Sequence, residues 1–272
     1  MFKRKAFTLI ELLVVIAIIA LLMAILMPSL QRVRKQAMAV ACRSNLHQLS
    51  FLLAAYADDN DGRFWRGWEG NAITGLRWFQ VLEPVYKDPK LRFCPMAVKP
   101  MWDSANPEGT RRNPFGAWVG TTMWGGDQTA GRSGSYGVNA WILNPKQDLT
   151  VIGGTFPAED KWRTPNVQGA GNIPAFSDAW WVDGHPFDRN MPPAFDGQMN
   201  GSRTEEMNRF CLNRHNKGLN VLFLDWSVRK VGLKELWTLK WHRSFNTAGD
   251  WTKAGLVEPG DWPEWMRSFK DY

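Results

Sequence analysis

The chain has 272 residues, a hydrophobic content of 44% and a formal net charge of +7. The apolar content excludes a chain that is disordered over most of its length. Apart from the flanks of one apolar segment, no stretch gathers cations with stacking aromatic residues, which argues against a nucleic-acid-binding protein. The length suits one membrane anchor and one globular domain of ordinary size.

The strongest signal is an apolar run near the amino terminus. Residues 7–26 are twenty residues of which only Thr8 and Glu11 are polar. As a helix, this run spans roughly 30 Å, the thickness of the hydrocarbon core of a bilayer. It is longer than the apolar part of an ordinary signal peptide. We therefore predict a leader over residues 1–6 and a transmembrane helix over residues 7–27.

Glu11 is a carboxylate about one turn into this predicted membrane helix. A charge at that depth costs a few kcal/mol on insertion scales, so it marks a functional site by default. A buried carboxylate also needs a cationic partner. Glu11 is therefore predicted to have a role other than packing.

Residues 3–13, KRKAFTLIELL, resemble the leader of type IV prepilins and of the pseudopilins of type II secretion. The resemblance implies that a prepilin peptidase cleaves between Ala6 and Phe7 and that the new terminal Phe7 is N-methylated. It implies that Glu11 pairs with the amino terminus of a neighbouring subunit during assembly. The family usually has Gly before the cut, so Ala6 predicts slower processing. Pro28 matches a position where family helices often kink, because proline removes a backbone hydrogen bond.

The same resemblance implies a location and partners. Cations flank the apolar run on both sides, so charge alone does not decide its orientation. The resemblance implies a single-pass inner-membrane protein with its amino terminus cytoplasmic before processing and its globular domain periplasmic or extracellular. The implied partners are other pilin-like subunits, the prepilin peptidase, the inner-membrane assembly platform and membrane lipid.

The helix is predicted to continue outside the membrane over residues 28–57, because no Gly or Pro occurs from Ser29 to Tyr56. Its apolar residues form two stripes, rotated by about a third of a turn. The first stripe is Leu30, Val33, Ala37 and Ala41, and the second is Met38, Cys42, Leu46, Leu49, Leu53 and Tyr56. Either the first stripe faces neighbouring subunits and the second this chain's own sheet, or the helix is buried broadly against its own domain. The sequence DDNDG at 58–62 predicts a stop and a turn.

Residues 58–272 are predicted to form a β-rich globular domain with long loops. All sixteen Trp residues lie in this part of the chain. Trp buries a large apolar area, so core packing is the first interpretation. The alternative is an exposed aromatic platform for polysaccharide, for which the candidates are Trp118, Trp124, Trp180 and Trp181.

Several segments of this domain have strand-like patterns. Residues 136–142 and 175–178 are predicted strands, and the apolar run 219–224 is predicted to pair with residues 227–231 in an antiparallel meander. A short amphipathic helix is predicted from Leu233 to Trp241. The fold class is therefore α+β and pilin-like: a long amino-terminal helix packed on an antiparallel sheet with loop-rich insertions.

His215, nine intervening residues and Asp225 resemble the His-x9-Asp-Gly segment of large families of pilin-like proteins that carry prepilin leaders. Trp226 occupies the Gly position, which counts against a turn with a positive φ there. We predict that His215 and Asp225 are structural and hold the meander together. The chain has no nucleophile motif, so we expect no catalytic residues, no enzyme and no cofactor.

No metal site is predicted from the spacing of acidic and histidine residues. Asp178, Asp183, His185 and Asp188 have oxygen and nitrogen ligands, but their spacing fits no calcium loop. The three cysteines allow at most one internal disulfide, which an oxidising compartment would favour. Cys42 could pair with Cys94 or with Cys211, and the sequence does not choose between them.

These patterns together predict a structural pilin-like subunit of a filament in a type II secretion or type IV pilus-like system. The first alternative is a membrane-anchored polysaccharide-binding protein that uses exposed Trp residues. A membrane-anchored hydrolase is the third interpretation. The sequence does not distinguish a major from a minor subunit, and it does not identify a cargo.

Overall fold

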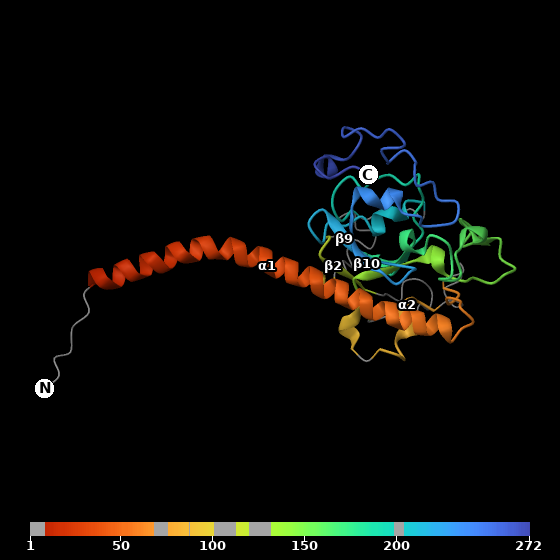
Figure 1. Cartoon of the computed structure of the whole chain (residues 1–272), viewed down its shortest axis with the longest axis horizontal. Coiled ribbons are helices and arrows are strands. Elements are labelled where there is room, and N and C mark those ends of the chain that lie inside the picture. The colour runs from red at the N-terminus through yellow and green to blue at the C-terminus, as the bar shows by residue number, and fades with distance from the viewer. Residues whose placement is uncertain (1–8, 68–75, 87, 101–112, 120–131, 199–203) are drawn as a thin grey trace. The chain divides into compact units, whose positions relative to one another are not determined.

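The computed structural model describes residues 9–67, 76–86, 88–100, 113–119, 132–198 and 204–272 (Figure 1). The chain divides into two compact units, Met1–Met38 and Ala39–Tyr272. The long helix α1, Leu9–Asp58, belongs to both units.

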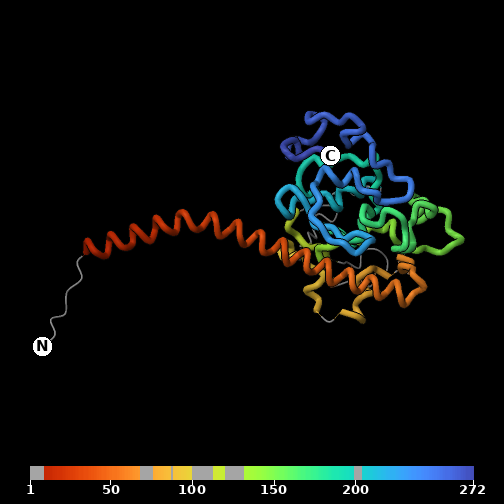
Figure 2. The backbone as a smooth tube through the Cα atoms, viewed as in Figure 1, coloured from red at the N-terminus to blue at the C-terminus, as the bar shows by residue number. Residues whose placement is uncertain are grey.

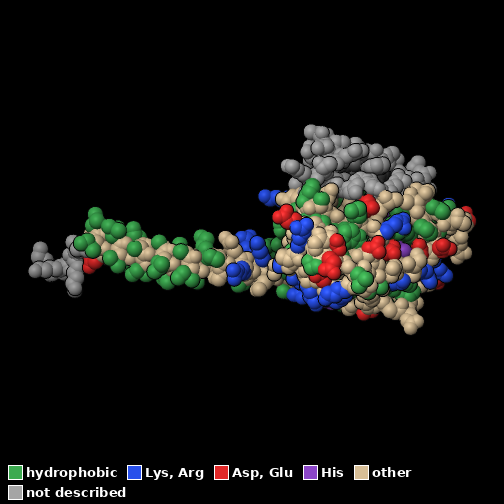
Figure 3. All heavy atoms as spheres, turned by 90° about the horizontal axis from the view of Figure 1, so that it is seen from above, with side chains coloured by type: hydrophobic (Ala, Val, Ile, Leu, Met, Phe, Trp, Pro, Cys, Tyr) green, Lys and Arg blue, Asp and Glu red, His purple; other side chains and the backbone are tan. Residues whose placement is uncertain are grey.

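The described part of the first unit is the amino-terminal part of α1. Its apolar side chains are exposed, from Leu9 through Val33, and they cover the visible face of this segment in Figure 3. Arg32, Arg34 and Lys35 follow the apolar run. Within the described residues, α1 is the one helix that is long and apolar enough to cross a membrane. Because water does not favour so many exposed apolar side chains, this surface requires lipid or protein neighbours.

In the second unit, α1 is buried along one face only. The buried residues of the helix are Cys42, Leu46, Leu49, Ser50, Leu53 and Ala57. Four of them belong to the second predicted stripe, whose other members, Met38 and Tyr56, are half-buried. Of the first stripe, only Ala41 lies in this unit, and it is exposed. Within this unit the helix is therefore not buried broadly, and the stripe predicted to face the domain is the buried one.

The core of the second unit is a five-stranded sheet in the order β10-β9-β7-β4-β8. Its strands are β4 (Tyr136–Asn139), β7 (Pro174–Asp178), β8 (Asp183–Gly184), β9 (Gly218–Phe223) and β10 (Val228–Gly232). Every pair is antiparallel except β4 with β8, which is parallel. The predicted meander is confirmed by the register of β9 and β10, in which Val228 faces Leu222 and Gly232 faces Gly218. The α+β architecture predicted from the sequence is therefore confirmed.

The remaining elements are short. They comprise the helix α2 (Trp78–Leu82), the strands β1 (Lys99–Pro100), β2 (Gly116–Val119), β3 (Ser133–Gly134), β5 (Val151–Ile152) and β6 (Phe156–Pro157), and the 3-10 helices η1 (Pro89–Arg92), η2 (Ala140–Ile142), η3 (Ala158–Asp160), η4 (Ala170–Asn172), η5 (Glu206–Arg209), η6 (Lys234–Thr238) and η7 (Glu264–Met266). The predicted strand 136–142 ends at Asn139 because the Asn139 side chain accepts a hydrogen bond from the Trp141 N–H and caps η2. The predicted helix 233–241 is reduced to η6.

Much of the second unit is irregular backbone, as its winding path in Figure 2 shows. Large aromatic side chains fill its core, and the fully buried Trp residues are Trp78, Trp118, Trp141, Trp237, Trp241 and Trp262. Four of these indole N–H groups donate to backbone carbonyls, such as that of Trp141 to Pro186 at 2.9 Å, whereas those of Trp78 and Trp262 have no hydrogen-bond partner among the described residues. Loops can therefore enclose a core here without long strands, since each ring buries a large apolar area and most of these rings also bond to the backbone.

The proposed sugar platform is not an exposed surface in the described residues. Trp118 and Trp180 are buried, with 1% and 3% of their surface exposed. Trp181 is half-buried, and Trp124 lies outside the described residues. Core packing, the first interpretation of these residues, is therefore confirmed for Trp118 and Trp180.

Candidate functional site

The amino-terminal processing residues are only partly described. Ala6 and Phe7 lie outside the described residues, so cleavage between them stays a prediction. Glu11 is exposed in the first turn of α1. Pro28 lies inside the continuous helix, and the kink expected there stays a prediction.

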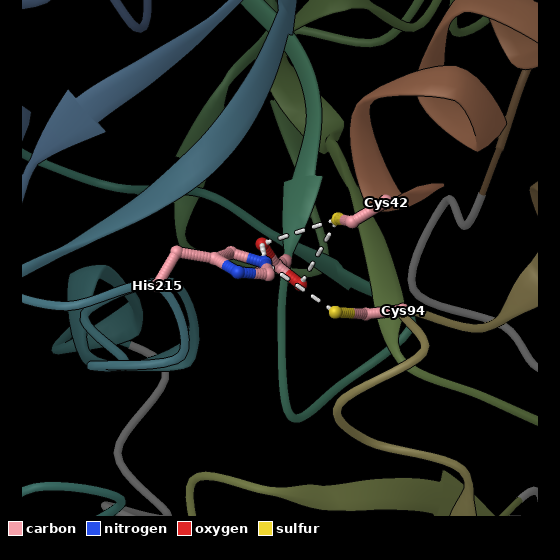
Figure 4. A group of neighbouring side chains, drawn as sticks. Cys42, Cys94 and His215 are labelled. Atoms are coloured by element: carbon pink, nitrogen blue, oxygen red, sulfur yellow. Dashed lines mark hydrogen bonds and ion pairs between the residues drawn. The ribbon is translucent and has the colours of Figure 1, made fainter. Parts of the chain in front are cut away.

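A buried polar cluster surrounds His215, one of the residues singled out from the sequence. The Nε2 atom of His215 lies 3.1 Å from Oδ2 of Asp178 and 3.4 Å from Sγ of Cys94. Sγ of Cys42 lies 3.8 Å from the same carboxylate oxygen. One ligand atom from each of these four residues lies within 4.8 Å of all the others. Figure 4 shows Cys42, Cys94 and His215 pointing toward one another.

Four separate segments deliver these side chains. Cys42 lies on the buried face of α1, and Cys94 lies two residues after the end of η1. Asp178 is the last residue of β7. His215 precedes β9, and its N–H donates to the Gly218 carbonyl at 2.9 Å.

The turn between His215 and β9 contains two consecutive residues with positive φ. Asn216 and Lys217 have φ angles of 52° and 65°. Left-handed residues in succession reverse the chain tightly, as in the turns of β-hairpins. This reversal directs the His215 ring inward while β9 continues into the sheet.

Arg214 holds the carboxylate of the cluster from the other side. Its Nη1 lies 3.3 Å from Oδ1 of Asp178, and the side chains of both residues are fully buried. The guanidinium also donates to the carbonyls of Pro114, Ser135, Gly116 and Ala179 at 2.5–3.0 Å. The backbone N–H of Asn220 donates to Oδ2 of Asp178 at 3.1 Å. Both carboxylate oxygens of Asp178 therefore have hydrogen-bond or ion-pair partners, as a buried carboxylate requires.

The charges within the cluster depend on one another. Burial opposes ionisation of Asp178, but His215 and Arg214 lower its pKa to about 2. Burial also opposes the cationic form of His215, but Asp178 raises its pKa to about 9. Burial acts against ionisation of Cys42, yet hydrogen bonds from Cys94 and His215 bring its pKa to about 7. Burial raises the pKa of Cys94 well above its usual value.

The geometry is not that of a Cys-His-Asp catalytic triad. In such a triad the carboxylate orients one ring nitrogen and the nucleophile contacts the other. Here Asp178 and Cys94 both approach Nε2, and Nδ1 of His215 is buried without a hydrogen-bond partner among the described residues. The two thiols are fully buried as well, so a substrate has no access to them. The cluster is a set of groups converging on one point rather than a relay.

Asp225 lies at the opposite end of β9 from His215 and has different partners. Its Oδ1 accepts hydrogen bonds from the N–H and the Oγ of Ser227, at 3.0 and 2.6 Å. Trp226, which stands where the His-x9-Asp-Gly pattern has Gly, has a φ of 67°. The turn therefore uses a positive φ although a non-glycine residue occupies the position. That His215 and Asp225 together hold the meander stays a prediction.

Asp183 and His185, two further residues considered from the sequence, belong to a second buried group, whereas Asp188 is half-buried. Asp183 pairs with Arg77 at 2.5 Å and with Arg209 at 3.5 Å. Nδ1 of His185 lies 3.3 Å from Glu206. The amino group of Lys161 lies 2.7 Å from Nε2 of His185. Burial lowers the pKa of Lys161 to about 7.

The three cysteines are free thiols in the structure, and all are buried. Cys42 and Cys94 belong to the cluster around His215, whereas Cys211 does not. The sequence suggested a disulfide of Cys42 with either Cys94 or Cys211, and it gave no sign that Cys42 and Cys94 meet Asp178 and His215. Cys42 and Asp178 are 136 positions apart, and Cys94 and His215 are 121 positions apart, so no local motif reveals the group.

The amino-terminal signal has a counterpart among known protein families. Residues 1–27 match the prokaryotic N-terminal methylation motif. Comparison of the chain with curated proteins and with solved structures finds no match. The motif supports a pilin-like or pseudopilin-like protein anchored in a membrane, and it marks structural subunits that are usually not enzymes.

Proposed function

We propose that the chain is a structural pilin-like subunit, a pseudopilin, of an inner-membrane-anchored filament in a type II secretion or type IV pilus-like system. The observation that carries the proposal is the methylation motif over residues 1–27, followed by a single helix that continues into a globular unit. Leader, apolar helix and anchored domain are the parts that such a subunit needs. This combination supports a filament subunit better than it supports an isolated membrane anchor.

The free-energy cost of placing the Glu11 carboxylate in a membrane helix supports the same proposal. A carboxylate in the apolar part of a membrane helix is expensive unless a cation neutralises it. Cleavage before Phe7 would create an ammonium group four positions ahead of Glu11. In a filament, the ammonium group of a neighbouring chain can place a positive charge beside Glu11.

The first test is the mass of the mature amino terminus. The chain is purified from membranes of a host that contains a prepilin peptidase, and its terminal peptide is measured by mass spectrometry. N-methyl-Phe7 is expected. An intact Met1 terminus in the native host would contradict the proposal. A variant with Gly in place of Ala6 is the matched control, and we expect it to be processed faster.

The second test separates assembly from insertion. Glu11→Gln keeps the shape of the side chain and removes its charge, so membrane insertion should be unchanged or improved. Filament assembly, measured by shearing and sedimentation or by cross-linking, should fall sharply. Glu11→Asp retains the charge and should assemble better than Glu11→Gln. Equal assembly of all three proteins would refute the pairing role.

The exposed stripe of α1 is the surface we assign to neighbouring subunits. Val33 has 58% of its surface exposed, although it is a large apolar side chain. Val33→Asp should lower assembly without unfolding the globular unit, whose core does not include Val33. The polysaccharide-binding alternative predicts that both Glu11 and Val33 variants keep full activity. The burial of Trp118 and Trp180 gives that alternative no support.

A further inference from the structure

The cluster around His215 contains four side chains that are typical metal ligands. Two sulfurs, one imidazole nitrogen and one carboxylate oxygen converge from α1, the loop after η1, the end of β7 and the turn before β9. All four residues are buried, with Cys42, Cys94 and Asp178 at 0% exposure and His215 at 5%. Such a concentration of polar groups in an apolar interior is expensive unless something binds them together.

Three of the distances between the ligand atoms are close to those around a tetrahedral zinc ion. Zinc lies about 2.3 Å from thiolate sulfur and about 2.0–2.2 Å from nitrogen or oxygen, so neighbouring ligand atoms are about 3.2–3.8 Å apart. In the structure Asp178 and His215 are 3.1 Å apart, Cys94 and His215 3.4 Å, and Cys42 and Asp178 3.8 Å. The remaining pairs of ligand atoms lie within 4.8 Å of each other, so an ion can bind after these atoms move closer by about 1 Å.

The donor set selects the kind of metal. Calcium and magnesium prefer oxygen ligands, so two cysteine sulfurs disfavour them. Thiolate with imidazole and carboxylate in a tetrahedral arrangement favours zinc. The charges balance as well. A dication with two thiolates, the Asp178 carboxylate, the Arg214 guanidinium and a neutral imidazole has no net charge, which suits a buried site.

Neighbouring groups already orient the ligands. Arg214 donates to Oδ1 of Asp178, and the Asn220 N–H donates to Oδ2. The Tyr136 hydroxyl lies 3.3 Å from the sulfur of Cys42. The N–H of Cys94 donates to Oγ of Ser135 at 2.6 Å. Hydrogen bonds of this kind fix ligand orientation in metal sites and tune the affinity.

From this geometry we propose that Cys42, Cys94, Asp178 and His215 bind one zinc ion. All four positions of the ion are filled by protein, so the site is structural and leaves no position for a substrate. Cys42 belongs to α1 and the other ligands belong to the loops and strands of the globular unit, so the ion fastens the helix to its own sheet. The inference concerns residues 39–272 and does not depend on the proposed filament function.

A disulfide between Cys42 and Cys94 is the competing state. It would remove both thiolates, and the chain could not then hold zinc through four ligands. The two states differ in mass, because the disulfide lacks the two thiol hydrogens. They also differ in metal content, so one preparation can distinguish them.

The test uses the full chain in detergent, purified without chelator and analysed by intact mass and by elemental analysis. One zinc per chain and a mass with both thiols reduced are expected. After removal of zinc under reducing conditions, cobalt(II) should produce the thiolate-to-metal band and the visible bands of a tetrahedral site. A chain that carries the disulfide, or a reduced chain that binds neither zinc nor cobalt, overturns the proposal.

Variants assign the ligands. Cys42→Ser and Cys94→Ser should each lose the bound zinc, whereas Cys211→Ser removes an equally buried thiol outside the cluster and should retain it. Tyr136→Phe should keep the metal but bind it about tenfold more weakly, because it loses an outer hydrogen bond. Tryptophan fluorescence of each variant reports whether the globular unit is folded. Zinc retained in both Cys42→Ser and Cys94→Ser would also overturn the proposal.

Discussion

Lys161 offers a direct test of the electrostatics of the globular core. Its side chain is fully buried, and its amino group contacts the Ala140 carbonyl and Nε2 of His185, each at 2.7 Å. Burial lowers its pKa to about 7 from the ordinary value of 10.5, although Asp183 and Glu206 act in the opposite direction. The folded chain therefore prefers a neutral Lys161, while the unfolded chain prefers a charged one.

The sign of the pH effect follows from proton binding. Between pH 7 and pH 10.5 the unfolded chain holds a proton on Lys161 that the folded chain largely lacks. Raising the pH through this window therefore favours the folded state. From pH 7 to pH 9 this one group should increase the free energy of unfolding by ~2 kcal/mol. For a unit of this size, the melting temperature should rise by roughly 4–8 °C from this contribution alone.

The comparison that isolates this contribution is wild type against Lys161→Met. Methionine has a similar length and no charge, so the variant should lack the Lys161 part of the rise between pH 7 and pH 9. All sixteen Trp residues lie after residue 64, so tryptophan fluorescence during thermal unfolding reports the globular unit. Lys253→Met removes a surface lysine and is the matched control. Identical pH slopes for wild type and Lys161→Met would refute the reasoning.

Three further predictions concern stability and use the same assay. Leu46→Ala should lower the free energy of unfolding by about 2–5 kcal/mol, because Leu46 is fully buried. Phe51→Ala on the exposed face should change it by less than about 0.5 kcal/mol, and equal effects of the two variants would contradict one-sided burial of α1. Burial lowers the pKa of His242 to about 4. The stability that the neutral imidazole gives the folded state is therefore present above pH 6.5 and is lost as the pH falls toward 4. Between pH 6.5 and pH 4, the free energy of unfolding of His242→Gln should fall by ~3 kcal/mol less than that of wild type. Leu256 is 83% exposed with a φ of 66°, so Leu256→Gly should stabilise by up to about 1 kcal/mol, while a comparable gain in Leu256→Ala would show that backbone strain is not the cause.

The sequence alone identifies features whose signal is local. The apolar run and its leader are contiguous, so length and polarity suffice to predict the helix, and the family motif over residues 1–27 agrees. The stripe that includes Cys42 and Leu46 follows from helical periodicity, because neighbours three and four positions apart share a face. The meander 219–231 follows from an apolar strand beside a turn and a returning strand. Each of these predictions needs only residues that are close along the chain.

In contrast, the sequence does not determine which Trp residues are buried and which are exposed. Trp118 and Trp181 have the same side chain and similar loop surroundings in the sequence, yet one is buried and the other is half-buried. Burial depends on which loops cover the ring, and loops of the Gly- and Pro-rich kind carry no periodic pattern. The length of β4 is also misjudged from the sequence. Its apolar pattern continues to Ile142, but the Asn139 side chain caps η2 and ends the strand at Asn139.

The buried cluster was decided only by the tertiary structure. The sequence places a cysteine on the helix face that meets the sheet, and it marks His215, but it offers Asp225 as the partner at the other end of the same strand. The fold instead brings Asp178 to His215 by pairing β7 with β9, and it brings Cys94 to them through a loop. Strand order and loop course depend on the summed packing of the whole core, whereas helix and turn signals depend on adjacent residues. For this reason the helix and the turns can be recognised in the sequence, while the convergence of Cys42, Cys94, Asp178 and His215 requires the folded chain.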